Sequence, residues 1–77
     1  MNQERRNQLE IILNRLEDVQ SDVIKILDEE EHYRDSIPEN LQDSAQYEQS
    51  CAVCDDLSDA ADGLADAVSS IVSAIAE

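Results

Sequence analysis

Apolar residues recur along the first half of the chain at intervals that alternate between three and four residues. This heptad spacing places them on one face of a helix. The pattern therefore predicts a long amphipathic helix over about residues 3–32. Its apolar stripe is expected to consist of Leu9, Ile12, Leu16, Val19, Val23 and Ile26, with Leu13, Ile24 and Leu27 widening it to one side.

The second half of the chain repeats the pattern and predicts another long helix over about residues 45–76. The expected stripe is Cys54, Leu57, Ala61, Leu64, Val68, Ile71 and Ile75, and its backward extension reaches Ser50 or Cys51 and then Tyr47. Alanines beside this stripe allow a partner helix to approach closely. A glycine inside a helix costs about 1 kcal/mol relative to alanine, so Gly63 indicates a close crossing or a slight bend.

The connection between the two helices covers residues 33–44. Ser36 and Glu39 match a capping box, and Pro38 is tolerated in a first helical turn, so a short helix is expected near residues 37–42. Asp43 or Ser44 is expected to cap the second long helix. The predicted fold is all-α: a single domain over residues 1–77, folded as an antiparallel, coiled-coil-like hairpin with a short helix in the connection.

A hairpin of two helices has only one seam, and some apolar residues fall outside it. Ile11, Ile24, Val53 and Val72 lie off the predicted stripes, where a monomer would expose them to water. A homodimer that forms a four-helix bundle would cover them. A monomer of low stability is the alternative, because a chain of this length buries little surface.

Charge is the strongest compositional feature, with 19 acidic and 5 basic residues giving a net charge of −14. All five bases lie within residues 1–34, whereas residues 35–77 hold ten acids and no base. A protein this acidic is not expected to bind nucleic acid or an anionic membrane surface itself. The acidity indicates either a surface that keeps the protein soluble or one that meets a basic surface, such as a nucleic-acid-binding groove of another protein.

The densest run of acids is expected on the outer face of the second helix. Solvated helices usually mix charges of both signs, because pairs three or four residues apart then attract one another. Here no lysine or arginine interrupts the run, so this face is the predicted partner-binding surface. Its residues are Asp55, Asp56, Asp59, Asp62 and Asp66.

The two cysteines suggest a metal site near the turn. Cys51 and Cys54 lie on one helix face, and matching the two stripes places them opposite Tyr33 and Glu30, beside the only histidine, His32. Thiolate, imidazole and carboxylate are the ligands of zinc. The predicted structural zinc site consists of Cys51, Cys54, His32 and Glu29, with Asp28 and Glu30 as rivals for the fourth position.

The cysteines also have a simpler interpretation as small core residues, which is common for cysteine. A redox motif is disfavoured, because the pair lies well inside a helix, and Asp55 and Asp56 beside it would raise the pKa values of the thiols. The sequence shows no phosphate-binding glycine loop and no pocket for paired carboxylates. We therefore expect a protein that is not an enzyme.

Neither a membrane span nor a signal peptide is apparent in the sequence. The protein is therefore expected in the cytoplasm of the cell that makes it, with both thiols reduced.

The segment from Glu29 to Glu48 resembles a family of short helical-hairpin proteins from prophages and mobile elements of Gram-positive bacteria. The resemblance covers essentially the whole chain and is most specific at Tyr33-Arg34-Asp35-Ser36-Ile37-Pro38-Glu39-Asn40-Leu41-Gln42. The cysteine pair with His32 departs from the usual pattern of that family. Size, acidity and the cysteine pair together resemble small metal-containing anti-CRISPR proteins that inhibit Cas9.

This resemblance implies a phage- or prophage-encoded inhibitor that binds Cas9, a type II effector nuclease, without enzymatic activity. Acidic residues would then contact a basic surface that otherwise handles guide RNA or target DNA. The alternative function is a structural or assembly protein, in which the hairpin associates with itself or pairs with a helix of a partner.

Overall fold

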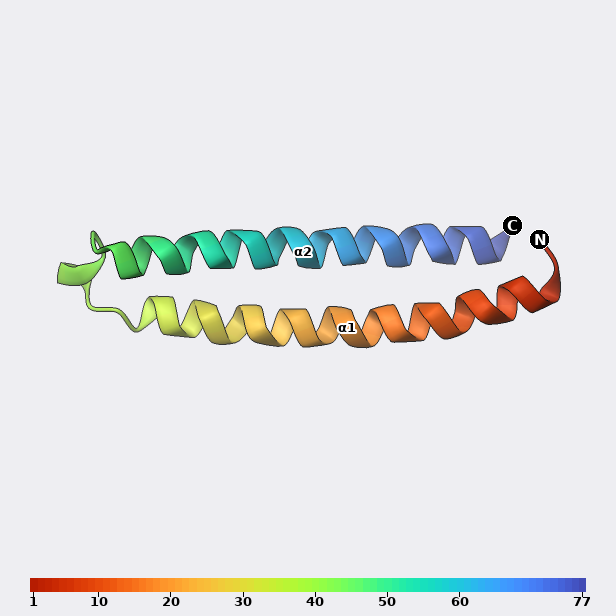
Figure 1. Cartoon of the computed structure of the whole chain (residues 1–77), viewed down its shortest axis with the longest axis horizontal. Helices are drawn as coiled ribbons and strands as arrows, with labels where there is room; N and C mark the ends of the chain where they lie inside the picture. The colour runs from red at the N-terminus through yellow and green to blue at the C-terminus, as the bar shows by residue number, and fades with distance from the viewer.

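The computed structural model describes all 77 residues and contains only helices. Helix α1 spans Gln3–Asp35, a single 3-10 turn (η1) spans Glu39–Leu41, and α2 spans Ala45–Ala76. The two long helices run antiparallel, side by side, so that both termini lie at the same end of the hairpin (Figure 1). The predicted fold, a two-helix hairpin with a short helix in its connection, is confirmed.

Short polar side chains begin both long helices. The Asn2 side chain accepts a hydrogen bond of 2.8 Å from the backbone N–H of Arg5, and the Ser44 hydroxyl accepts one of 3.2 Å from that of Tyr47. Each bond satisfies one of the free N–H groups at a helix N-terminus. Of the two residues expected to cap α2, Ser44 is the one that does so.

The predicted capping box in the connection is wrong. Ser36 closes the C-terminus of α1, where its backbone N–H reaches the carbonyls of His32 and Tyr33 and its hydroxyl donates to the Tyr33 carbonyl at 2.7 Å. The 3-10 turn has no side-chain cap. Because Ser36 is used by the preceding helix, α1 extends to Asp35, three residues beyond its predicted end.

The apolar seam of α2 follows the predicted stripe, but half of the α1 seam is displaced by one residue. Ile12, Val19 and Ile26 are exposed at 42%, 46% and 53%. The half-buried residues of α1 that alternate at intervals of three and four are instead Leu9, Leu13, Leu16, Gln20, Val23, Leu27, Glu30 and Arg34. The apolar stripe of α1 is wider than one seam, so periodicity alone did not decide between neighbouring residues.

The core between the helices is shallow. Only Ser50, Cys54 and Ala61 are buried, and no large side chain is fully buried. The molecule measures 59 × 14 × 13 Å, so nearly every residue lies within reach of water. Two helices in contact along a single line cannot enclose side chains on all sides, and the isolated hairpin therefore has little hydrophobic stabilisation.

Replacing Gly63 with alanine is expected to stabilise the hairpin. A Cβ atom at this position would have no other heavy atom within 4 Å, so Gly63 marks no close crossing of the helices. Alanine should therefore raise the free energy of unfolding by about 0.5–1 kcal/mol, because it restricts the unfolded chain and favours the helix. Urea unfolding followed by circular dichroism measures this; a loss of stability would show that the site is sterically constrained.

Candidate functional site

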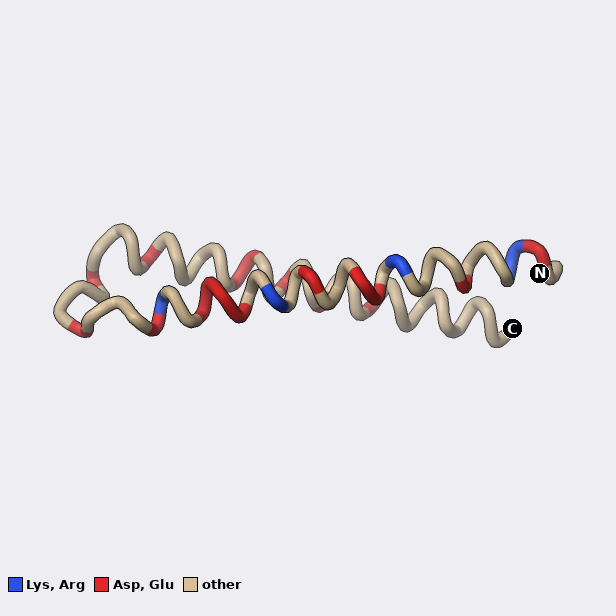
Figure 2. Tube along the Cα trace, turned by 90° about the horizontal axis from the view of Figure 1, so that it is seen from below, with Lys and Arg blue, Asp and Glu red and all other residues tan.

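The predicted partner-binding aspartates all lie on the outer face of α2, and all five are exposed. Asp55, Asp59, Asp62 and Asp66 follow one another at intervals of four, three and four residues, which places them in one row along the helix. Asp56 lies to one side of this row. We call these five residues the acidic face. The turns of α2 beyond it, up to its last residue, Ala76, contain no charged residue and are tan in Figure 2.

No basic side chain neutralises the acidic face. The single ion pair of the structure joins the Arg34 guanidinium to the Asp35 carboxylate of the same helix at 3.1 Å. Aspartates three or four residues apart therefore repel one another, at a cost of about 0.2–0.5 kcal/mol for each close pair. The acidic face thus combines a locally unfavourable arrangement of like charges with free access for a cationic partner.

The two thiols lie near the turn, and Cys54 is buried against α1. Burial raises the pKa of the Cys54 thiol, Arg34 opposes this by favouring the thiolate, and Glu30 and Glu31 add to the increase. Glu30 also accepts a hydrogen bond of 2.8 Å from the Ser50 hydroxyl, which ties α1 to α2 beside the thiol. This environment favours the protonated thiol of Cys54 over the reactive thiolate.

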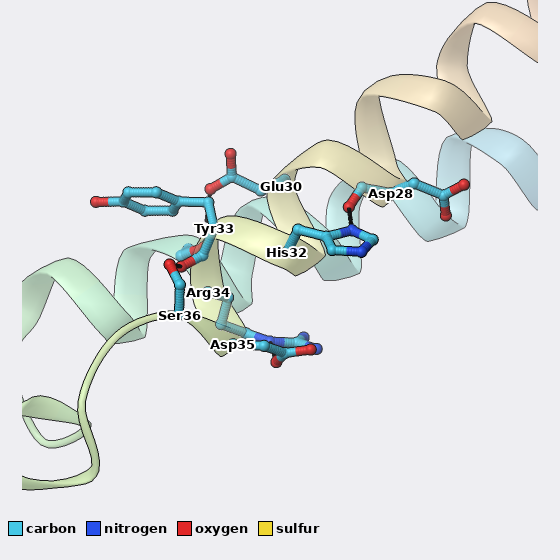
Figure 3. A network of polar contacts seen from close by, with 8 residues as sticks. Asp28, Glu30, His32, Tyr33, Arg34, Asp35 and Ser36 are labelled. Atoms are coloured by element: carbon cyan, nitrogen blue, oxygen red, sulfur yellow. Dashed lines mark hydrogen bonds and ion pairs between the residues drawn. The ribbon is translucent and has the colours of Figure 1, made fainter.

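His32 is turned away from the thiols. Its side chain is exposed, and its ring Nδ1 lies 2.7 Å from the backbone carbonyl oxygen of Asp28, one turn earlier in α1 (Figure 3). A proton on Nδ1 makes this contact a hydrogen bond to the carbonyl. Because Glu30 and Arg34 occupy the seam positions of α1, the residues Glu29 and His32 fall on its solvent side.

The structure therefore does not bring the predicted zinc ligands together. No group of three or more histidine, cysteine, aspartate or glutamate side chains is close enough to hold a metal ion. Cys54 faces α1, whereas Glu29 and His32 point into solvent, so the four side chains do not fit a tetrahedral site in this arrangement. Zinc binding stays a prediction from the sequence. Elemental analysis of the purified protein tests this prediction directly. A protein that contains no zinc would refute it.

Sequence reasoning missed the role of Arg34. It is half-buried on the seam, it pairs with Asp35, and its charge acts on both Cys54 and Tyr47. The Tyr47 hydroxyl interacts with the Cys51 thiol, which raises the pKa of the tyrosine. Extending the seam by seven residues from Leu27 reaches Arg34. The heptad spacing therefore marked this seam position, but the prediction placed it at the neighbouring residue, Tyr33.

Because Cys54 is buried, we expect its thiol to be alkylated slowly in the folded chain. In a Cys51→Ser variant, alkylation of Cys54 by iodoacetamide at pH 8 should be about tenfold slower or more in the folded chain than in urea, since the thiolate is the reactive form. Mass spectrometry over time gives both rates. Equal rates would show that the fold neither shields the Cys54 thiol from the reagent nor raises its pKa.

The same pKa increase predicts how stability depends on pH. The folded state holds the Cys54 proton more tightly than the unfolded state does. Unfolding therefore releases a proton once the pH exceeds about 8.5, the pKa of an unfolded thiol. This contribution to stability should be complete below that pH and should be lost as the pH rises through the folded pKa.

Comparisons of the chain with protein-family models, with curated proteins and with solved structures each returned no match. Neither long helix contains a segment that is apolar enough over sufficient length to cross a membrane. The acidic face and the surroundings of the thiols are thus the features on which a function can be argued.

Proposed function

We propose that this protein is a non-enzymatic inhibitor that binds a basic, nucleic-acid-handling surface of another protein through its acidic face. The observation that carries the proposal is the row of exposed aspartates on α2 without a neutralising base. A surface whose charges repel one another when it is free gains stabilisation when a cationic partner covers it.

The density of charge on the acidic face is close to that of a nucleic-acid strand. Asp55 and Asp66 are eleven residues apart, which corresponds to about 16 Å along the helix axis at about 1.5 Å per residue. The five charges span four intervals, so their mean spacing along the axis is about 4 Å, compared with about 3.4 Å per charge along one strand of DNA. A groove that is built to hold phosphates would therefore meet a similar spacing of negative charge on α2.

The resemblance of the chain in size, acidity and cysteine pair to small anti-CRISPR proteins supports Cas9 as the partner. In this proposal the protein acts in the bacterial cytoplasm, where a phage or prophage gene would produce it. It would occupy a basic surface that otherwise holds guide RNA or target DNA. Inhibition would then require stoichiometric binding and no turnover.

A cleavage assay tests the proposal. Increasing amounts of the protein are added to Cas9 with its guide RNA, and cutting of a linear target DNA is followed. Cleavage should fall to zero as the protein reaches molar excess, and the inhibition should weaken as the salt concentration rises, because salt screens exposed charges over about 10 Å at 0.1 M. Undiminished cleavage at large excess would reject Cas9 as the partner.

A second function, as a structural or assembly protein, is favoured by the exposed apolar residues of α1. Ile12, Val19 and Ile26 each leave about half of their surface exposed in the isolated hairpin. Pairing of these residues with another helix would depend on apolar contact and would respond little to salt. The salt dependence of binding therefore discriminates between the two functions.

A further inference from the structure

One side of α1 carries an unbroken apolar row at intervals of seven residues. Ile12, Val19, Ile26 and Tyr33 make up this row, and their exposed fractions lie between 42% and 53%. Residues seven apart in a helix that packs along a heptad seam stay on the same side of that seam. The row therefore runs parallel to the hairpin axis, beside the contact with α2.

A row of small and apolar residues runs along α2 on the same side. The side chain of Gln46 donates a hydrogen bond to the Tyr33 hydroxyl, which shows that the two rows adjoin at the turn. In an antiparallel heptad pair the neighbours further along are then Ile26 with Val53, and Val19 with Ala60. We call the two rows together the apolar face; its α2 members are Gln46, Val53, Ala60, Ala67 and Ala74.

The two sides of the hairpin differ in charge. None of the residues that make up the two rows of the apolar face is charged. On the opposite side of the seam, α1 presents Glu10, Glu17 and Glu31 at the equivalent heptad positions, with Ile24 as the one apolar residue among them. The two rows of the apolar face are thus free of charge, and charged residues such as Arg15, Asp22 and Asp56 lie only along their outer border. That distribution is expected for a surface that becomes desolvated.

We propose that the apolar face is a self-association interface, through which two copies of the chain dock face to face as a four-helix bundle. A two-fold axis along the hairpin would place the bulky α1 row of each copy over the small α2 row of the other. Large residues opposite small ones allow the two surfaces to interdigitate. The contact is isologous, so both copies use the same residues.

The apolar face is long enough for a helix-to-helix contact over several turns. Ile12 and Tyr33 are 21 residues apart, which corresponds to about 32 Å along the helix axis at about 1.5 Å per residue, within the 59 Å length of the hairpin. The isolated chain buries only three residues, and a second copy would supply the missing wall of its core. Two −14 chains can approach along this side because the charges of α2, including the row of aspartates from Asp55 to Asp66, lie on its outer face.

Sedimentation equilibrium of the purified protein under reducing conditions tests the interface. The wild type should have twice the chain mass of 8.6 kDa. Ile26→Lys should reduce the mass to that of a single chain. Ile24→Lys is the matched control: this isoleucine is two residues away on α1, is 41% exposed compared with 53% for Ile26, and lies on the opposite side of the seam. It should leave the dimer intact.

A second pair of variants tests the packing of α1 over α2. Ala60→Lys, within the apolar face, should also give a single chain, whereas Ala65→Lys, an exposed alanine outside it, should remain a dimer. Circular dichroism verifies that each variant is helical. A monomeric wild type, or equal masses for the Ile26 and Ile24 variants, would overturn the interface. A dimeric Ala60→Lys variant beside a monomeric Ile26→Lys variant would overturn the packing of α1 over α2. None of these measurements involves Cas9, so they are independent of the proposed function.

Discussion

Replacing Asp55, Asp59, Asp62 and Asp66 with asparagine is expected to weaken binding to Cas9 by about 100-fold. An exposed ion pair contributes up to about 1 kcal/mol, so the loss of four pairs amounts to about 3 kcal/mol, and each 1.4 kcal/mol corresponds to a tenfold change in affinity. The dissociation constant is measured by titrating fluorescently labelled Cas9. The asparagine variant should also unfold at a higher urea concentration, because the aspartates no longer repel one another.

The control for this variant removes the same number of charges from the other helix. Four acids of α1 are replaced by their amides, which leaves the acidic face intact and changes the net charge equally; they are Glu4, Glu10, Glu17 and Asp18. This variant should bind Cas9 within about threefold of the wild type, because distant charges act mainly through a screened field. An equal loss for both variants would mean that overall charge, and not the acidic face, determines binding.

The second prediction concerns how much the displaced seam of α1 contributes to the free energy of unfolding. Leu13→Ala should lower the free energy of unfolding by about 2 kcal/mol, which is at the low end for leucine because the side chain is half-buried. Ile11→Ala should cost less than about 0.5 kcal/mol, since Ile11 is 55% exposed on the outer face of α1. Ile11 also lies outside the apolar face, so dimer formation does not affect the comparison. Urea unfolding gives both values. A similar loss of unfolding free energy in the two variants would contradict the placement of Leu13, and not Ile11, in the seam.

Much of the fold could be predicted from the sequence. The heptad spacing of α2 identified its seam correctly, because the alternatives to residues such as Leu57 and Leu64 are aspartate, serine and alanine. The α1 stripe was ambiguous, because Ile12 and Leu13 are adjacent, as are Ile26 and Leu27, and either member of each pair completes a heptad. Only packing against α2 decides between them, and the helix packs on the leucines.

This ambiguity explains why the predicted zinc ligands do not meet. Choosing Ile26 for the seam extends it to Tyr33 and brings His32 and Glu29 closer to α2. Choosing Leu27 extends it to Arg34 and rotates His32 into solvent, where its ring turns to the Asp28 carbonyl. A shift of one residue thus changes the side of the helix on which a ligand lies. Cys54 is buried in either case, since it belongs to the well-determined seam of α2.

The same shift produces the apolar face. The isoleucines and the valine that were expected in the seam lie beside it, and with Tyr33 they form the row that we propose as the dimer interface. The acidic face does not depend on the choice, because it is defined by α2 alone. A dimer would display two acidic faces on the outside of the bundle, each free to bind a basic surface.

A competition experiment tests whether the acidic face binds a surface that otherwise holds nucleic acid. Fluorescently labelled target DNA is bound to guide-loaded Cas9, and the protein is titrated in while fluorescence anisotropy is recorded. We expect the DNA to be displaced, with the asparagine variant of the acidic face requiring about 100-fold more protein in line with its weaker binding. A ternary complex that retains the DNA at full affinity would contradict the claim.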